Sequence, residues 1–73
     1  MKKRVCYLSE FYRFTTYNEN ISDKSINEDC KNNNAKLVAI FNERKNKVKF
    51  FCSISENDKR DIQEYLGYIE KAV

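Results

Sequence analysis

The sequence is poor in several residue types on which catalytic and ligand-binding sites depend. It contains no histidine, no tryptophan and no proline, and Gly67 is its single glycine. Without histidine the chain lacks the commonest general base and metal-binding side chain, and one glycine cannot form the glycine-rich loop that cradles a nucleotide phosphate. Most of the common motifs for catalysis, metal binding and nucleotide binding are therefore excluded.

Long apolar segments are also missing. The longest uninterrupted apolar run is residues 37–41, whereas a helix needs roughly 20 apolar residues to span a bilayer. The basic start at residues 1–4 is typical of a signal peptide, but Glu10 and Arg13 interrupt the apolar stretch that a signal peptide requires next. We therefore expect a cytoplasmic protein that does not enter a membrane.

The three cysteines, Cys6, Cys30 and Cys52, form no recognisable pair. Their spacings of 24 and 22 contain no C-x-x-C motif, and no histidine is available to complete a zinc site, so we expect reduced thiols and no bound metal. Cys6 and Cys52 fall in strand-like patterns, where small buried side chains are expected. Cys30 falls in a polar segment, so we expect it to be the most exposed of the three and the first to react with a thiol reagent.

The absence of histidine also disfavours catalysis. A nucleophilic cysteine needs a base held against it, and the chain has no histidine to serve as one. Carboxylate-only metal sites need clustered acids, but Asp58, Asp61 and Glu64 follow the spacing of the solvent-facing side of a helix. We therefore expect a protein that is not an enzyme and that needs no cofactor.

The composition is that of a small folded domain. Apolar residues make up 41% of the chain and charged residues 34%, and five tyrosines and five phenylalanines supply the aromatic content, which is typical of globular proteins. A domain of this length buries only about 60% of the surface that its unfolded chain exposes. We expect one domain over residues 1–73, folding alone or as a small oligomer with a thin margin of stability.

The strongest local pattern predicts a β-hairpin. Residues 36–42 and 48–54 are β-rich and flank the polar stretch 43–47, which predicts a five-residue loop. In the first strand both faces are apolar, which predicts an interior position in a sheet. One of these faces carries Leu37, Ala39 and Phe41, and the other carries Val38 and Ile40. In the second strand one face is wholly apolar, and its members are Val48, Phe50, Cys52 and Ile54.

A helix is predicted over residues 56–72. Ser55 can cap its N-terminus, and acidic residues occupy the first turn. An apolar stripe at helical spacing should cover the apolar face of the hairpin, and its members are Ile62, Tyr65, Leu66, Ile69 and Val73. Gly67 would lie inside this helix at a cost of roughly 1 kcal/mol relative to alanine, which indicates either a close approach of a neighbouring backbone or no particular role.

The N-terminal half leaves alternatives open. Residues 3–17 are rich in β-branched and aromatic side chains, which predicts one long bent strand or two short ones. Residues 18–34 are polar and carry six asparagines. Ser22 could cap a short helix within residues 21–31, with Ile26 and Cys30 on one face, but a loop fits the same residues.

Together these elements predict an α+β fold. A small antiparallel sheet of three or four strands packs one face against the C-terminal amphipathic helix. The hairpin and this helix are adjacent in sequence, so they can dock without a long crossover. The predicted core takes either Ala39 or Ile40, together with Leu37, Phe41, Phe50, Cys52, Ile54, Ile62, Leu66 and Ile69.

The charge distribution is uneven. Residues 1–17 and 35–55, where strands are predicted, carry a net charge of +7, whereas residues 18–34 and 56–73 carry −4. Basic side chains interleaved with aromatic ones are the ingredients of a surface that follows a phosphate backbone and stacks on bases. The plainer explanation is that lysines at a hairpin tip and a sheet edge prevent edge-to-edge aggregation, while most aromatics belong to the core. Phe51 is the exception, because strand alternation sends it to the face opposite the core.

The sequence supports two functional hypotheses. The first is a non-enzymatic binding protein that inhibits or regulates a larger host protein, such as part of a nucleic-acid-handling complex, by occupying its surface. The alternative is direct binding of single-stranded nucleic acid through the basic, aromatic side of the sheet. An exposed Phe51 with Tyr12 or Phe14 beside it would form an interaction patch. The candidate contact residues are Tyr12, Arg13, Arg44, Lys45, Lys47, Lys49 and Phe51.

The amino-acid composition offers a further indication of source. Lysine, asparagine and isoleucine make up 25 of the 73 residues, which fits AT-rich coding DNA from a low-GC bacterium, its phages or its plasmids, and equally from an AT-rich eukaryote or virus. Small inhibitors of bacterial defence complexes, anti-CRISPR proteins among them, are often of this size and composition. By this class-level analogy alone, the first hypothesis extends to an inhibitor encoded by a phage or a mobile element.

Overall fold

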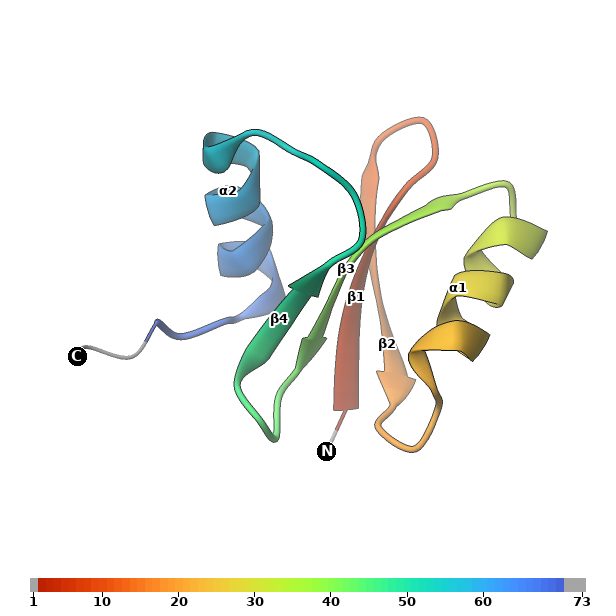
Figure 1. Ribbon diagram of the computed structural model, residues 1–73, viewed down its shortest axis with the longest axis horizontal. Coiled ribbons are helices and arrows are strands. Elements are labelled where there is room, and N and C mark those ends of the chain that lie inside the picture. Colours follow the sequence, from red (N-terminus) through yellow and green to blue (C-terminus); the bar gives the residue numbers. More distant parts are fainter. Residues whose placement is uncertain (1, 71–73) are drawn as a thin grey trace.

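The computed structural model describes residues 2–70 and consists of a four-stranded antiparallel sheet between two helices (Figure 1). The elements are β1 (Lys2–Leu8), β2 (Tyr12–Asn18), α1 (Asp23–Asn32), β3 (Lys36–Asn42), β4 (Lys47–Phe50) and α2 (Glu56–Leu66). The strand order is β2-β1-β3-β4, with α1 over one face and α2 over the other. The predicted α+β fold is confirmed, with a second helical layer added. No helix in the described part of the chain is long and apolar enough to cross a bilayer.

The structure of the N-terminal half shows which alternative holds at each of the two segments that the sequence leaves open. Residues 3–17 lie in two strands, β1 and β2, which pair with each other across a short turn. The polar segment after them forms a helix and not a loop. Ser22 is the N-cap of α1, and its hydroxyl oxygen accepts a hydrogen bond from the backbone N–H of Ser25 at 3.2 Å. Ile26 and Cys30 are buried on the side of α1 that meets the sheet.

A β-bulge in β3 decides which side chains face each helix. In the pairing of β1 with β3, Cys6 lies opposite Ala39 but Tyr7 lies opposite Leu37, so Val38 is the extra residue. The alternation of side chains therefore inverts at Val38, which joins Ala39 on the α2 side while Leu37 turns to the α1 side. The predicted grouping of Leu37 with Ala39 is wrong, because the period of two does not continue across a bulge.

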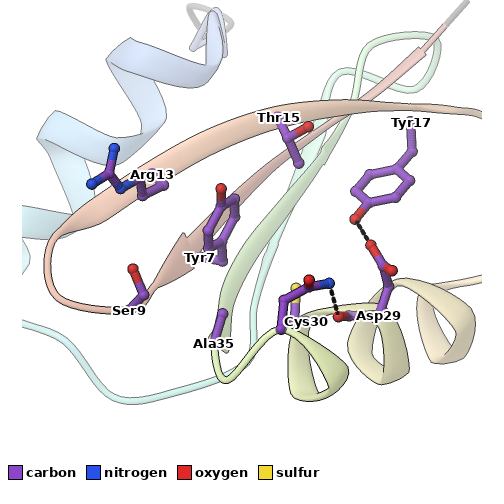
Figure 2. Close-up of a pocket in the computed structure, with 9 residues that line it drawn as sticks. Tyr7, Ser9, Arg13, Thr15, Tyr17, Asp29, Cys30 and Ala35 are labelled. Carbon is purple, nitrogen blue, oxygen red and sulfur yellow. Dashed lines mark hydrogen bonds between the residues drawn. The ribbon is translucent and has the colours of Figure 1, made fainter.

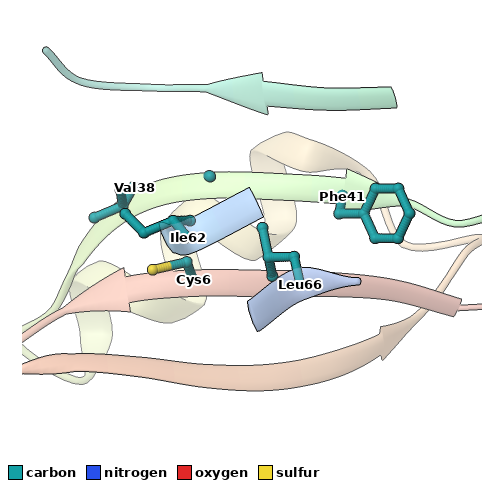
Figure 3. Packing of buried hydrophobic residues seen from close by; sticks show 6 residues of the cluster. Cys6, Val38, Phe41, Ile62 and Leu66 are labelled. Atoms are coloured by element: carbon teal, nitrogen blue, oxygen red, sulfur yellow. The ribbon is translucent and has the colours of Figure 1, made fainter. Parts of the chain in front are cut away.

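The face under α2 is packed around Ile62 and Leu66, which are 2% and 1% exposed. Figure 3 shows these two side chains lying over β1 and β3. The buried members of this α2-side cluster are Cys6, Val38, Ala39, Phe41, Ile62 and Leu66, and the partly buried side chains around it are Leu8, Val48, Phe50, Cys52, Ile54 and Tyr68. The helix thus packs on β1 as well as on the predicted hairpin.

The opposite face of the sheet forms a second cluster under α1. Its buried members are Val5, Ile26, Cys30, Leu37 and Ile40, with Tyr7, Tyr17 and Ala35 packed against it. Because both faces of β3 are covered and β3 pairs on both sides, its predicted interior position is confirmed. The single core predicted from the sequence is in fact two, since the sheet separates Leu37 and Ile40 from the α2-side cluster.

The second strand of the predicted hairpin is shorter than expected. β4 ends at Phe50 and not at Ile54, and its connection to β3 occupies residues 43–46. The backbone N–H of Phe51 donates to the carbonyl oxygen of the bulge residue Val38 at 2.8 Å. The bulge therefore ends the regular ladder at this point, and the chain leaves the sheet toward α2.

α2 begins where the sequence predicts and ends earlier. Ser55 is its N-cap, and the Ser55 hydroxyl oxygen accepts from the backbone N–H three residues on at 3.2 Å. The helix ends at Leu66 because Gly67 adopts the left-handed conformation, with φ of 85°. A Cβ at Gly67 would lie 2.7 Å from Nη1 of Arg4, and this nitrogen donates to the carbonyl of Leu66 at 3.3 Å. The prediction that Gly67 lies inside the helix is wrong, because it terminates the helix.

Two residues of the predicted core stripe are exposed, one inside α2 and one beyond its end. Ile69 is 72% exposed and Tyr65 is 75% exposed, so neither belongs to the core. The backbone of Ile69 instead meets the β3–β4 connection: Nδ2 of Asn46 donates to the Ile69 carbonyl at 2.7 Å, and the Ile69 N–H donates to Oδ1 of Asn46 at 3.4 Å. Val73, the last predicted member of the stripe, lies outside the described residues.

The structure reverses the expected order of thiol exposure. Cys30 is 4% exposed because α1 turns it into the sheet, so the prediction that it is the most exposed thiol is wrong. Cys6 is fully buried as predicted, whereas Cys52 is half-buried beyond the end of β4. Burial, with a smaller effect of Cys52, raises the pKa of Cys6 to about 12, and burial also raises the pKa of Cys30.

We expect Cys52 to react first with a thiol reagent under native conditions. The thiolate is the reactive species, and both burial and a raised pKa hold Cys6 and Cys30 in the thiol form. Mass spectrometry of peptides after a brief pulse of N-ethylmaleimide measures the order in which the cysteines are modified. The same pulse in denaturant should modify all three cysteines equally. Modification of Cys30 before Cys52 would contradict the packing of α1.

Candidate functional site

The two helices leave different edge strands uncovered. α2 packs on β1 and β3, so the side chains of β2 on that face are open, with Tyr12 39% and Phe14 41% exposed. α1 packs over β1 and β3 from the other side, so Lys49 of β4 is exposed there, opposite Ile40. Each face of the sheet therefore has one uncovered strip, and the two strips lie at opposite edges.

The uncovered strip beside α2 forms a groove between β2 and that helix. Its volume is about 510 Å³. We call it the aromatic groove, and its lining residues are Phe11, Tyr12, Phe14, Asp58, Asp61, Ile62 and Tyr65. The first three come from the β1–β2 hairpin and the others from α2, so the groove exists only because the tertiary structure brings these two segments together.

Four aromatic rings of the groove are exposed. Phe11 is 66% and Tyr65 is 75% exposed, in addition to Tyr12 and Phe14. The rings of Phe14 and Tyr65 stack with centroids 5.3 Å apart and an interplanar angle of 29°, which joins β2 to α2 across the groove. A contiguous exposed patch of this kind marks an interaction site more often than a scattered set of single apolar residues does.

The electrostatics of the groove are negative. Asp58 and Asp61 are exposed on the helix wall. Partial burial and the nearby Asp58 carboxylate raise the pKa of Tyr12. Among residues 2–70 the ion pairs join Lys3 to Asp23, Arg4 to Glu43 and Arg44 to Glu19, and none of them involves a carboxylate of the groove. The groove therefore combines aromatic faces with acidic groups that are free of internal partners in the described chain.

The uncovered strip on the other face carries positive charge. Lys45, Lys47 and Lys49 line a shallow depression of about 310 Å³ beside β4, and Nζ of Lys49 lies 5.3 Å from the ring centroid of Phe51. We call these four residues the basic surface. Lys3 borders the same depression, but its ammonium is paired with Asp23 at 3.1 Å, so it adds little free charge.

The seven contact residues predicted from the sequence are not brought together. The structure gathers Lys45, Lys47, Lys49 and Phe51 in the basic surface. Tyr12 lies in the aromatic groove at the opposite edge of the sheet, three strand spacings or roughly 14 Å away. The predicted patch of Phe51 with Tyr12 or Phe14 therefore does not form.

The two predicted arginines belong to neither surface. Arg44 lies in the β3–β4 connection, with Nη1 3.8 Å from the carboxylate of Glu19. Arg13 points to the α1 face of β2, because it follows Tyr12 in the strand and side chains alternate. There it lines a separate, polar depression, so the basic and aromatic residues of β2 are divided between the two faces of the sheet.

The depression beside Arg13 has a structural explanation. Its volume is about 380 Å³, and Figure 2 shows it between the β1–β2 hairpin and α1. The hydroxyl of Tyr17 donates to the Asp29 carboxylate, and this hydrogen bond, with burial, raises the pKa of Tyr17 to about 12. Nδ2 of Asn33 donates to the Asp29 carbonyl at 2.8 Å. These bonds tie α1 to β2 and to its own C-terminus.

The sequence alone does not mark the α2 wall of the groove as a site. Asp58, Asp61 and Tyr65 are spaced three and four apart, which places them along one side of a helix. This spacing is the signal in the sequence that could indicate a shared surface. The same sequence also fits Tyr65 to the apolar stripe of the core. Only the position of β2 beside the helix distinguishes a groove residue from a core residue.

No protein-family model, no curated protein and no solved structure matches the chain. Within residues 2–70 no group of three or more His, Cys, Asp or Glu side chains is arranged to hold a metal ion. Functional assignment therefore depends on the geometry and charge of the two surfaces.

Proposed function

We propose that the protein is a non-enzymatic binding protein that occupies a surface of a larger protein through the aromatic groove. The observation that carries the proposal is the exposure of four aromatic rings side by side, contributed by Phe11, Tyr12, Phe14 and Tyr65. Aromatic residues are enriched at protein interfaces and supply a large share of their binding energy. In a domain that has only two small clusters to stabilise it, four large rings left outside both clusters are best explained by a partner.

The size of the molecule is compatible with this role. Its accessible surface is 5532 Å², and a standard interface buries about 800 Å² of each partner. Such an interface would take roughly one seventh of the surface. By class-level analogy in size and composition we extend the proposal to an inhibitor of a host complex, encoded by a phage or mobile element.

The proposal is tested by affinity capture from a low-GC bacterial lysate with three baits. The baits are the wild type, the Phe14→Ala/Tyr65→Ala variant and the Phe51→Ala variant, which removes an exposed ring from the basic surface. Loss of an aromatic anchor costs about 2 kcal/mol or more, or roughly 30-fold in affinity. We expect the wild-type and Phe51→Ala baits to recover a protein that the double-variant bait does not recover. Equal recovery by all three baits, or recovery of nothing above background, would count against the proposal.

Single-stranded nucleic-acid binding is the alternative, and the basic surface is the observation that favours it. Three lysines line the depression there, and one of them, Lys49, lies 5.3 Å from the ring centroid of the exposed Phe51, which suits a phosphate backbone with a stacked base. The aromatic groove does not extend this surface, because Asp58 and Asp61 on its wall would repel phosphates. The protein-binding proposal is therefore preferred.

A salt titration with a short single-stranded oligonucleotide separates the two functions. For nucleic-acid binding, the logarithm of affinity falls against the logarithm of salt with a slope of about −0.7 per phosphate contacted. Lys45→Ala/Lys47→Ala should then flatten the slope, whereas Phe51→Ala should remove roughly 1–3 kcal/mol of stacking with the slope unchanged. We expect no submicromolar binding at about 150 mM salt, and its observation would favour the alternative.

A further inference from the structure

On the basis of the proposed function, we infer that the aromatic groove binds an arginine side chain from a basic segment of the partner protein. The guanidinium would lie against the exposed rings and donate hydrogen bonds to the carboxylates on the α2 wall. The groove of about 510 Å³ has room for such a side chain and for part of the backbone on either side of it.

The carboxylates of the groove are open to a cation from outside. Asp58 and Asp61 follow each other by three residues on α2 and both line the groove. In the described part of the chain each of them lacks a lysine or arginine within ion-pairing distance, whereas Asp23, Glu43 and Glu19 each have one. Among residues 2–70, Asp23, Glu43 and Glu19 are thus paired with a cation of the chain, and the two carboxylates of the groove are not.

The aromatic rings show the same contrast. Outside the groove, Lys49 lies 5.3 Å from the ring centroid of Phe51 and Lys59 lies 5.2 Å from that of Phe50, both within the roughly 6 Å at which a cation is attracted to a ring face. In residues 2–70 no cation of the chain is so placed over the rings of Tyr12 and Phe14. A cation supplied by the partner would fill this position.

Arginine fits the groove better than other side chains. Its guanidinium is planar, so it can stack on a ring while donating two hydrogen bonds to one carboxylate. A phosphate or an acidic peptide would meet Asp58 and Asp61 with like charge. A second copy of this chain offers its basic surface, but that surface lies at the opposite sheet edge, and the resulting head-to-tail contact would form rings or open polymers and not a two-fold dimer.

Fluorescence anisotropy with a fluorescein-labelled nona-arginine peptide measures binding affinity and so tests the inference directly. We expect Asp58→Asn/Asp61→Asn to weaken binding about tenfold at low salt, because it removes both charges at nearly constant shape. The matched control Glu28→Gln/Glu56→Gln removes two exposed carboxylates outside the groove and should change binding less than about twofold. A nona-lysine peptide should bind more weakly than nona-arginine, and a nona-glutamate peptide should not bind.

Equal loss in the groove variant and the control, or unchanged affinity in both, would overturn the inference. Its failure can be distinguished from failure of the proposed function. A captured protein that requires Phe14 and Tyr65 but tolerates Asp58→Asn/Asp61→Asn would sustain the proposed function and reject the arginine. Sedimentation velocity gives the last outcome: concentration-dependent polymers that vanish in Asp58→Asn/Asp61→Asn would make a second copy the occupant and would also overturn the inference.

Discussion

Leu66→Ala is expected to lower the free energy of unfolding by about 2–5 kcal/mol. Leu66 is 1% exposed, and with Ile62 it is one of two buried residues through which α2 packs on the sheet. Removing three carbons there leaves a cavity that the surrounding sheet cannot fill, because β1 and β3 are held by their ladders. Domains are stable by only about 5–15 kcal/mol, so this loss is a large part of the total.

A urea titration followed by circular dichroism measures the effect of this substitution. Glu64→Ala is the control, because Glu64 is exposed two residues away in the same helix, and it should shift the unfolding free energy by no more than about 0.5 kcal/mol. If Leu66→Ala is already unfolded in water, Leu66→Met keeps the side-chain volume and should lose less than about 1.5 kcal/mol. Equal midpoints for Leu66→Ala and Glu64→Ala would show that α2 is not docked.

Ile26→Ala should have an effect of similar size on the other face of the sheet, about 2–5 kcal/mol. Ile26 is fully buried in the α1-side cluster, and α1 is a polar helix of ten residues, too short to persist without packing. Amide hydrogen exchange should show protection lost first in α1. The control Lys24→Ala, at an exposed position of the same helix, should leave the exchange pattern unchanged, and protection of α1 that survives Ile26→Ala would show that the helix is held by other contacts.

Elements with local signals can be predicted from the sequence, although residues 21–31 fit a loop as well as a helix. Ser22 and Ser55 cap helices because their hydroxyls satisfy backbone N–H groups within one turn, and no distant residue is needed for that. The apolar side chains on both faces of residues 36–42 required an interior strand. The layer that covers the second face of this strand is α1, which the sequence left open between helix and loop.

The candidate site can be predicted only in part from local patterns in the sequence. The sequence grouped basic and aromatic residues because they share strands, and the lysines at 45, 47 and 49 do form one surface with Phe51. Strand alternation, however, divides Tyr12 from Arg13. The order of the four strands then places Tyr12 and Phe51 at opposite edges, which no local pattern encodes.

The bulge at Val38 and the groove depend on contacts between distant segments, whereas the end of α2 has a local signal in the single glycine. The bulge depends on how β1 pairs with β3, so it placed Leu37 and Ala39 on opposite faces of the sheet without a local signal. Gly67 ends α2 in a left-handed conformation where Arg4, distant in sequence, reaches the last carbonyl. Tyr65, which helical spacing alone assigned to the core, became part of a groove because β2 lies beside α2. Periodicity fixes which side of an element is apolar, but pairing between distant segments decides what that side meets.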